Sequence, residues 1–322
     1  MFVIDNLIRD TVSDHDITRT LAQWARVSKT ASTAARRALY KHVTLRIHHI
    51  DKIEDQALLA ALPIVDNTCL PFSDVKLYDR LVSSPGVASL VERLTLDFVT
   101  APEYRYHESG VHADKASNGK LFERLTHLKE LDLAHIRYGD LTQIGRFLNT
   151  RLFQSRSCDL VIRPVDVHHH AEDTLFKHRV RELDDFVASY GACGTVTLDE
   201  IDPRNRLPYK GLSPFLNTAT NPRGIRARLT KIRTVFPIAT EALPEVSYEW
   251  SHLHALAYVE FHCTPSCPIT AQRAARGVLP VMPPSLRSLY LACKLRVPSI
   301  RHLRSGQFCS IIFRICSDAT DM

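Results

Sequence analysis

The sequence predicts an α/β protein in which short helices alternate with strands. Two observations support this fold class. Apolar residues recur at spacings of three and four, as on one face of a helix, and are followed by alternating apolar and polar positions, as in a half-buried strand. Hydrophobic residues make up 45% and charged residues 24% of the 322 positions, which is enough to bury a sizeable core.

The best-formed helix–strand unit spans residues 173–202. Gly191 follows the helical stretch and is well placed to end the helix in the left-handed conformation. The next segment, TVTLDEI, has the pattern of a strand. The apolar positions at helical spacing are Leu175, Phe176, Val180, Leu183, Phe186, Val187 and Tyr190. The same order recurs in VKLYDRLVSS before VERLTLDF, in SNGKLFERLTHLKE before LDL, and in TAQRAARGVL before PPSLRSLYL.

The predicted strands share the local pattern L-x-x-L-x-L. Two segments fit it in full: Leu128, Leu131 and Leu133, and Leu286, Leu289 and Leu291. Segments that begin at Val91, Cys193, Leu229 and Leu253 fit with substitutions, and CDLVIRPV is a further candidate strand. Equivalent positions are expected at Leu94, Leu131, Leu160, Val196, Ile232, Leu256 and Leu289, at intervals of 37, 29, 36, 36, 24 and 33 residues.

This pattern resembles an irregular leucine-rich repeat. The resemblance implies a solenoid of parallel strands with helices on the convex side. The intervals are longer and less even than the usual repeat of about 20 to 29 residues. The Asn expected just after each strand is replaced by Val99, Ile136 and Lys294. A single α/β domain built from βαβ units shares the same alternation and remains the alternative.

The first 45 residues predict short helices followed by a strand. Apolar residues form one stripe at helical spacing, whereas Arg26, Lys29, Arg36 and Arg37 fall mostly off it. Alternation of Val43, Leu45 and Ile47 with polar residues then predicts a half-buried strand. The stripe consists of Ile17, Leu21, Trp24, Ala25, Ala31, Ala35 and Leu39. So short a helical unit needs a partner surface to bury its apolar side chains.

The run TLAQWARVSKTASTAARRALYKHVTL resembles the F-box of fungal F-box proteins. The matching positions are Leu21, Val27, Ser28, Lys29, Leu39, Tyr40, Val43, Thr44 and Leu45. With the helical segment before it, the F-box-like module covers about an eighth of the chain. The Leu-Pro pair that usually opens the motif is replaced by Val3-Ile4 or Ile4-Asp5, and the usual Trp after Val-Ser is Ala31.

The resemblance implies a substrate-recognition adaptor of a Skp–cullin–F-box type ubiquitin ligase. Its partners would be a Skp-type adaptor within the cullin ligase complex and a protein client held by the repeats. The expected adaptor-binding residues are Leu7, Ile8, Ile17, Leu21, Trp24 and Val27. The expected domains are an F-box-like module at 1–42, an irregular leucine-rich-repeat domain at 43–300 and a tail at 301–322.

The composition and the absence of known motifs argue against several other classes of protein, among them membrane proteins, secreted proteins and enzymes. The net charge of +6 is only mildly basic and neither demands nor excludes an acidic partner. No apolar run is long enough to span a bilayer, so we expect no membrane partner. Nucleic acid is not expected as a partner, because the basic run at 223–233 has no aromatic interleaving and no recognisable binding motif occurs. Eight cysteines without a secretory signal favour reduced thiols in an intracellular protein, cytoplasmic or nuclear. No phosphate-binding glycine motif or nucleophile motif occurs, so we expect no enzyme and no cofactor.

Several clusters in the sequence contain residue types that bind metals or anions. His107 to His112, His168 to His170, and His262 with Cys263 and Cys267 lack the spacing of a metal site, so no metal is expected. Arg223, Arg226, Arg228, Lys231 and Arg233 lie within 11 positions without an acid, and we expect a solvated flank. Residues 202–228 predict a long surface loop. A scaffold without a ubiquitin link and, next, a basic nucleic-acid-binding protein are the alternative functions.

Overall fold

The structure is a computed structural model of the chain. It describes residues 20, 23, 26, 28–48, 75–99, 121–122, 124–136, 157–165, 174–189, 193–201, 214–235, 250, 252–262 and 283–292.

The chain divides into two compact units. Unit 1 comprises Met1–His48 and Lys52–Asp132, and unit 2 comprises His49–Asp51 and Leu133–Met322. The predicted domain boundaries after residues 42 and 300 stay predictions, and residues 301–322 lie outside the described part of the chain.

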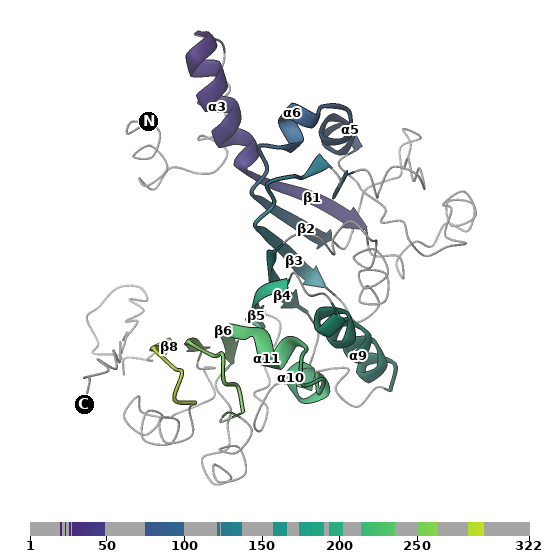
Figure 1. Cartoon of the computed structure of the whole chain (residues 1–322), viewed down its shortest axis with the longest axis vertical. Helices are drawn as coiled ribbons and strands as arrows, with labels where there is room; N and C mark the ends of the chain where they lie inside the picture. The colour runs from purple at the N-terminus through teal and green to yellow at the C-terminus, as the bar shows by residue number, and fades with distance from the viewer. Residues whose placement is uncertain are drawn as a thin grey trace, which may run out of the picture. The chain divides into compact units, whose positions relative to one another are not determined.

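Eight parallel strands form one sheet in the order of the chain, from β1 to β8 (Figure 1). This arrangement confirms the predicted α/β class with parallel strands. The strands are β1 (His42–His48), β2 (Arg93–Val99), β3 (Glu130–Ile136), β4 (Cys158–Pro164), β5 (Cys193–Asp199), β6 (Leu229–Val235), β7 (Tyr258–His262) and β8 (Ser288–Ala292).

Alternation along β1 and β2 separates a buried face of the sheet in unit 1 from a more exposed one. Val43, Leu45 and Ile47 of β1 are buried, as predicted, whereas Thr44 and Arg46 between them are exposed. In β2 the buried set is Leu94, Leu96 and Phe98. The two strands are in register, with Leu45 opposite Leu96, so the buried residues line up across the sheet.

Among the described residues of unit 1 are the helices α3 (Lys29–Lys41), α5 (Val75–Ser83) and α6 (Pro85–Ala88). Ser28 caps α3, because its hydroxyl accepts a hydrogen bond of 3.1 Å from the backbone N–H of Ala31. Helix α5 confirms the helix predicted in VKLYDRLVSS. The helix predicted around residues 121–128 is shorter than expected, because Leu125 and Leu128 lie in the turn that leads into β3; both side chains are buried.

Unit 2 contains α9 (Thr174–Ser189), α10 (Pro214–Thr218) and α11 (Ile225–Arg228). Helix α9 confirms the strongest helix prediction and contributes Phe176, Val180, Leu183 and Val187 to the core. The predicted surface loop at 202–228 is wrong for residues 214–228. This part forms α10 and α11, and four of its apolar side chains are fully buried: Phe215, Leu216, Ala219 and Ile225. Its Pro, Asn and Arg content therefore marks short helix boundaries rather than a solvated loop.

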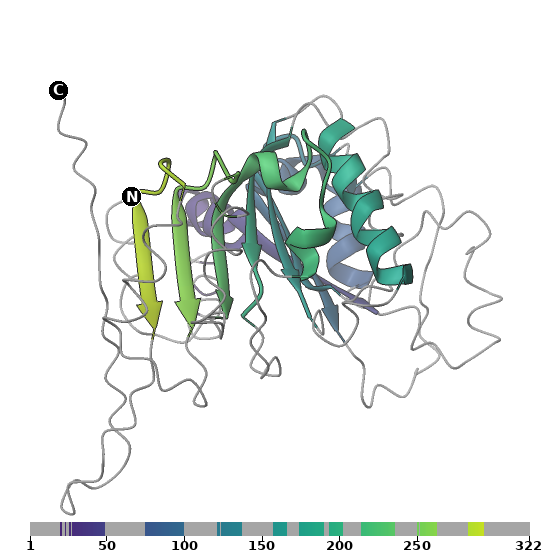
Figure 2. The ribbon, with the colours of Figure 1, turned by 90° about the horizontal axis from the view of Figure 1, so that it is seen from below.

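The register of unit 2 differs from the expected repeat positions in two places. Leu160 lies opposite Val196, as expected. Ile232 instead lies opposite Leu198, because a bulge shifts the register of β5 and β6 between Val196 and Thr197. The partner of Ile232 on β7 is Val259, not Leu256, which lies in the turn before β7. Figure 2 shows β6, β7 and β8 side by side and pointing the same way.

Within the described residues, no helix is both long and apolar enough to cross a membrane.

Candidate functional site

Strands β5 to β8 of unit 2 present one buried face and one half-exposed face. In β7, Val259 and Phe261 are buried, whereas Tyr258, Glu260 and His262 are half-buried. The buried face packs against apolar side chains, including Trp250, whose ring centroid lies 5.6 Å from that of Phe261. The half-exposed residues are thus held on strands whose opposite sides are fixed in the core.

The in-register strands align four side chains in one row across this face. Asp199 of β5 lies opposite Arg233 of β6, Arg233 opposite Glu260 of β7, and Glu260 opposite Tyr290 of β8. Adjacent strands in a sheet are about 4.8 Å apart, so side chains at paired positions contact one another directly.

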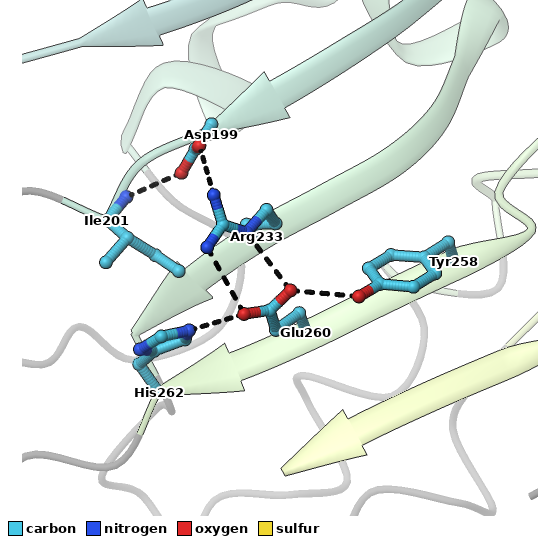
Figure 3. Close-up of polar contacts among 6 residues, drawn as sticks. All are labelled: Asp199, Ile201, Arg233, Tyr258, Glu260 and His262. Atoms are coloured by element: carbon cyan, nitrogen blue, oxygen red, sulfur yellow. Dashed lines mark hydrogen bonds and ion pairs between the residues drawn. The ribbon is translucent and has the colours of Figure 1, made fainter. Parts of the chain in front are cut away.

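Arg233 is the centre of the row and binds both neighbouring acids (Figure 3). Its Nη1 donates to Asp199 Oδ2 at 2.6 Å. Its Nε and Nη2 donate to the two oxygens of Glu260 at 3.0 and 3.3 Å, which makes a bidentate pair. Fork-to-fork pairs of this kind fix orientation as well as adding energy. Asp199 is fixed in turn by the backbone N–H of Ile201, which donates to its Oδ1 at 3.3 Å.

Glu260 accepts two further hydrogen bonds from its own strand. The Tyr258 hydroxyl donates to Oε2 at 2.9 Å, and His262 Nε2 donates to Oε1 at 2.6 Å. The carboxylate therefore receives four hydrogen bonds, which uses its available acceptor positions. Burial alone would raise the pKa of Glu260, but the hydrogen bonds from His262, Arg233 and Tyr258 outweigh it and lower that pKa to about 2.

The pKa values of two partners of Glu260, Tyr258 and Arg233, are raised, as expected for groups that donate hydrogen bonds to a carboxylate. Burial and the hydrogen bond to Glu260 raise the pKa of Tyr258 to about 12. Burial would lower the pKa of the Arg233 guanidinium, but Glu260 and Asp199 together raise it above its ordinary value. Near neutral pH the carboxylate is thus ionised and the phenol protonated. These two groups are therefore not suited to exchange protons with a substrate near neutral pH.

The ring of Tyr258 is contacted by a cation and by a second ring. The ammonium of Lys231 lies 4.5 Å from the ring centroid, within the range of a cation–π contact. The Tyr290 ring lies 4.9 Å away and is tilted by 31°. Two tyrosines, an arginine and a lysine thus form a continuous patch on β6, β7 and β8. We call this patch, together with Asp199, Glu260 and His262, the sheet-face cluster.

A buried aspartate fixes the turn that enters β6. Asp184 of α9, 1% exposed, accepts hydrogen bonds of 2.7 Å from the backbone N–H groups of Asn221 and Ile225. Burial raises the pKa of Asp184, although both hydrogen bonds oppose this shift. Gly224 lies so close that a Cβ atom there would be 2.0 Å from Asp184 Oδ1. The turn therefore holds β6, and with it Arg233, in a fixed position.

Most of the binding residues predicted from the sequence lie outside the part of the chain that the structure describes. All six expected adaptor-binding residues lie outside the described residues: Leu7, Ile8, Ile17, Leu21, Trp24 and Val27. The histidines of 107–112 and 168–170, Cys263 and Cys267 also lie outside them. Within the described part, no three His, Cys, Asp or Glu side chains are grouped closely enough to hold a metal ion.

The basic segment 223–233 is not the uniform solvated flank that its sequence predicts. Arg233 lies in the sheet-face cluster, and Lys231 contacts Tyr258. Arg228 donates hydrogen bonds to the backbone oxygens of Cys193 and Arg223. Sequence reasoning missed Asp199 and Glu260 because these acids lie on neighbouring strands. The available signal was the alternation of apolar and polar residues in TVTLDE and YVEFH, which places both acids on the polar face.

Comparison with known proteins identifies no relative. No protein-family model matches the chain, and no curated protein is significantly similar to it in sequence.

Proposed function

We propose that this chain is a substrate-recognition adaptor of a Skp–cullin–F-box type ubiquitin ligase. Its N-terminal helices would dock a Skp-type adaptor, and the sheet-face cluster of an irregular leucine-rich-repeat solenoid would hold a client protein. The chain would perform no chemistry itself and would raise the effective concentration of the client near the enzyme that transfers ubiquitin. The observation that carries the client-binding part is the rigid, half-exposed cluster on β5 to β8.

The composition of this cluster supports protein recognition. Tyr and Arg are the residues most enriched among those that dominate the energy of protein interfaces. Tyr258 and Arg233 are already held by Glu260, so little conformational entropy would be lost when a partner binds. Arg233 and Lys231 balance Asp199 and Glu260 in charge. We therefore expect a client contacted through aromatic and hydrogen-bonding groups rather than through a large excess of one charge.

The N-terminal segment supports the docking part of the proposal. Helix α3 leads directly into β1, and Ala35 is its only buried residue. A helix with so little buried surface has room for a partner protein. A scaffold without a ubiquitin link is the second candidate, supported by the half-buried positions of Ala31 and Leu39, which place part of the apolar stripe against the chain itself.

Site-specific photo-crosslinking tests the client-binding part. A photoreactive phenylalanine analogue replaces Tyr290 in the cluster and, as a matched control, Lys76, which is exposed on α5. In extract of the source organism, position 290 should give a discrete protein adduct that position 76 does not give. Lys231→Ala should reduce that adduct about tenfold, the loss expected for one important interface contact. Equal adducts from both positions would contradict client binding at this face.

A further inference from the structure

Residues 17–50 carry a strongly one-sided charge. The segment contains seven Lys and Arg residues and no Asp or Glu, whereas the whole chain has nearly balanced charges, 41 basic against 35 acidic. Four of the seven lie in α3: Lys29, Arg36, Arg37 and Lys41. All four are exposed.

The four cations lie on the side of α3 that faces away from its buried residue. Lys29, Arg37 and Lys41 belong to one row of four-residue steps, and Arg36 lies beside that row, two turns from Lys29 and nearly in phase with it. Ala35, fully buried, marks the opposite side. The exposed residues of α3 are Lys29, Thr30, Thr33, Ala34, Arg36, Arg37 and Lys41, which we call the α3 cationic face.

Little of this charge is neutralised inside the unit. Within the described residues, Lys29, Arg36 and Arg37 form no ion pair, and the side chain of Lys41, 51% exposed, lies 3.9 Å from Glu92. Glu92 also pairs with Lys129 at 3.0 Å, so one carboxylate is shared between two lysines. Figure 1 shows α3 extending beyond the ends of β1 and β2 of the same unit. Like charges on one helix face repel each other, and an anionic ligand relieves that repulsion.

We propose that the α3 cationic face binds the phosphate backbone of duplex nucleic acid. Arg, Lys and Thr side chains are the usual phosphate-contacting groups, and a cluster of Lys and Arg along one helix is the electrostatic footprint of nucleic-acid binding. The helix is about 20 Å long, which is enough to reach several phosphates of one duplex. Binding through this face is independent of base sequence, because phosphate contacts carry no sequence information.

The composition of the face favours a nucleic acid over an acidic protein. The cores of protein interfaces are rich in aromatic residues and poor in Lys, whereas the exposed residues of α3 include two lysines and no aromatic residue. The same composition favours a duplex over a single strand, which is usually held by stacking of its bases on aromatic rings. The one aromatic residue of α3, Tyr40, is half-buried and is covered by Arg80, whose Cζ lies 5.4 Å from its ring centroid.

This inference goes beyond the adaptor function and does not depend on it. In the sequence pattern, the basic residues of this segment fall mostly off the apolar stripe that is proposed to dock a Skp-type adaptor. An adaptor with both surfaces would act on clients bound to chromosomal DNA or to structured RNA. Loss of docking would leave nucleic-acid binding intact, and the reverse also holds.

Fluorescence anisotropy of the full chain with a labelled 20-base-pair duplex tests the proposal. Binding is measured between 50 and 300 mM salt for the wild type and for Arg36→Glu/Arg37→Glu. The matched control is Lys76→Glu/Arg124→Glu, which changes the net charge by the same amount at two exposed positions of unit 1 outside α3. Arg36→Gln/Arg37→Gln provides a milder change that keeps good helix formers, and circular dichroism verifies that each variant is folded.

We expect the wild type to bind with an affinity that falls steeply with salt, with a slope of about −3 to −4 for four phosphate contacts. Arg36→Glu/Arg37→Glu should weaken binding at least tenfold at 50 mM salt, and Arg36→Gln/Arg37→Gln should make the slope shallower by about two. The control variant should stay within about twofold of the wild type. Absence of binding at 50 mM salt, an equal loss in the control, or tighter binding to polyglutamate than to the duplex would each overturn the proposal.

Discussion

Glu260 makes the free energy of unfolding depend on pH. Because this carboxylate is held by hydrogen bonds, the dependence has the opposite sign to that of a buried carboxyl without partners. The pKa of Glu260 is about 2 in the folded chain, against 4.5 in the absence of these contacts. Because the folded-state pKa lies below the unfolded one, the carboxylate stabilises the fold above about pH 5. This contribution is lost as the pH falls through about 2. The shift corresponds to about 3 kcal/mol at neutral pH, as an upper value.

Part of that value is lost to solvent screening, because Arg233 and His262 are each 34% exposed, whereas Glu260 is 18% exposed. We therefore expect Glu260→Gln to lower the free energy of unfolding by about 1 to 3 kcal/mol at pH 7. By pH 3 the difference from the wild type should fall to less than half, because the carboxyl of the unfolded chain, with its pKa near 4.5, is then protonated.

Urea unfolding followed by the fluorescence of Trp250 measures this difference at both pH values. Trp250 packs against Phe261, next to Glu260 in β7, and reports on unit 2. The second tryptophan, Trp24, is replaced by Phe in all proteins. The control is Asp79→Asn, an exposed carboxylate of α5 that forms no ion pair within the described residues. A Glu260→Gln effect that is the same at pH 7 and pH 3, or no larger than that of the control, would refute the reasoning.

Three further predictions concern the fixed parts of unit 2. Gly224→Ala should destabilise unit 2 by about 1 to 3 kcal/mol in the same urea assay, because the new Cβ would lie 2.0 Å from Asp184 Oδ1 and 2.9 Å from the Asp184 backbone oxygen. Gly86→Ala is its control, since a Cβ there meets no atom within 4 Å, and it should be neutral or slightly stabilising; equal effects would be evidence against the contact. Asp184→Ala should cost about 2 to 4 kcal/mol, because the N–H groups of Asn221 and Ile225 lose their acceptor, whereas Asp185→Ala, at an exposed position, should cost less than half of that. Cys158 and Cys193 should resist alkylation at pH 7 until urea unfolds the chain, since both are buried and burial raises the pKa of Cys193 to about 11; mass spectrometry of native and unfolded samples measures this, and rapid native labelling would contradict it.

The strands were predictable because each buries one face. Val43, Leu45 and Ile47 alternate with polar residues for that reason, and the same pattern in TVTLDE located β5. Helix α9 was predictable because its apolar residues recur over four turns. Helices α10 and α11 were not, since a helix of four or five residues is too short to display a periodicity, and Pro214 and Gly224 at their starts look like loop residues in isolation.

The sheet-face cluster could not be predicted from the sequence for a different reason. Arg233 binds acids that lie 34 residues before it and 27 residues after it, and only the register of β5, β6 and β7 brings them together. That register depends on the bulge between Val196 and Thr197, and the expected repeat positions placed Leu256 where Val259 lies. The basic run alone therefore indicated a solvated flank, although strand pairing neutralises its last residue, Arg233.

The central claim is that the chain links a Skp-type adaptor to a client. The most direct test is co-expression of the full chain with a Skp-type adaptor, followed by size-exclusion chromatography. Leu21→Asp/Trp24→Asp is the test variant, and Lys76→Gln/Arg124→Gln, at two exposed positions, is the control with the same change in net charge. The account predicts a stable one-to-one complex for the wild type and the control that is lost in the Leu21→Asp/Trp24→Asp variant. A wild-type chain that elutes as a well-behaved monomer without the adaptor would contradict it, and the N-terminal helices would then be an internal cap of a scaffold.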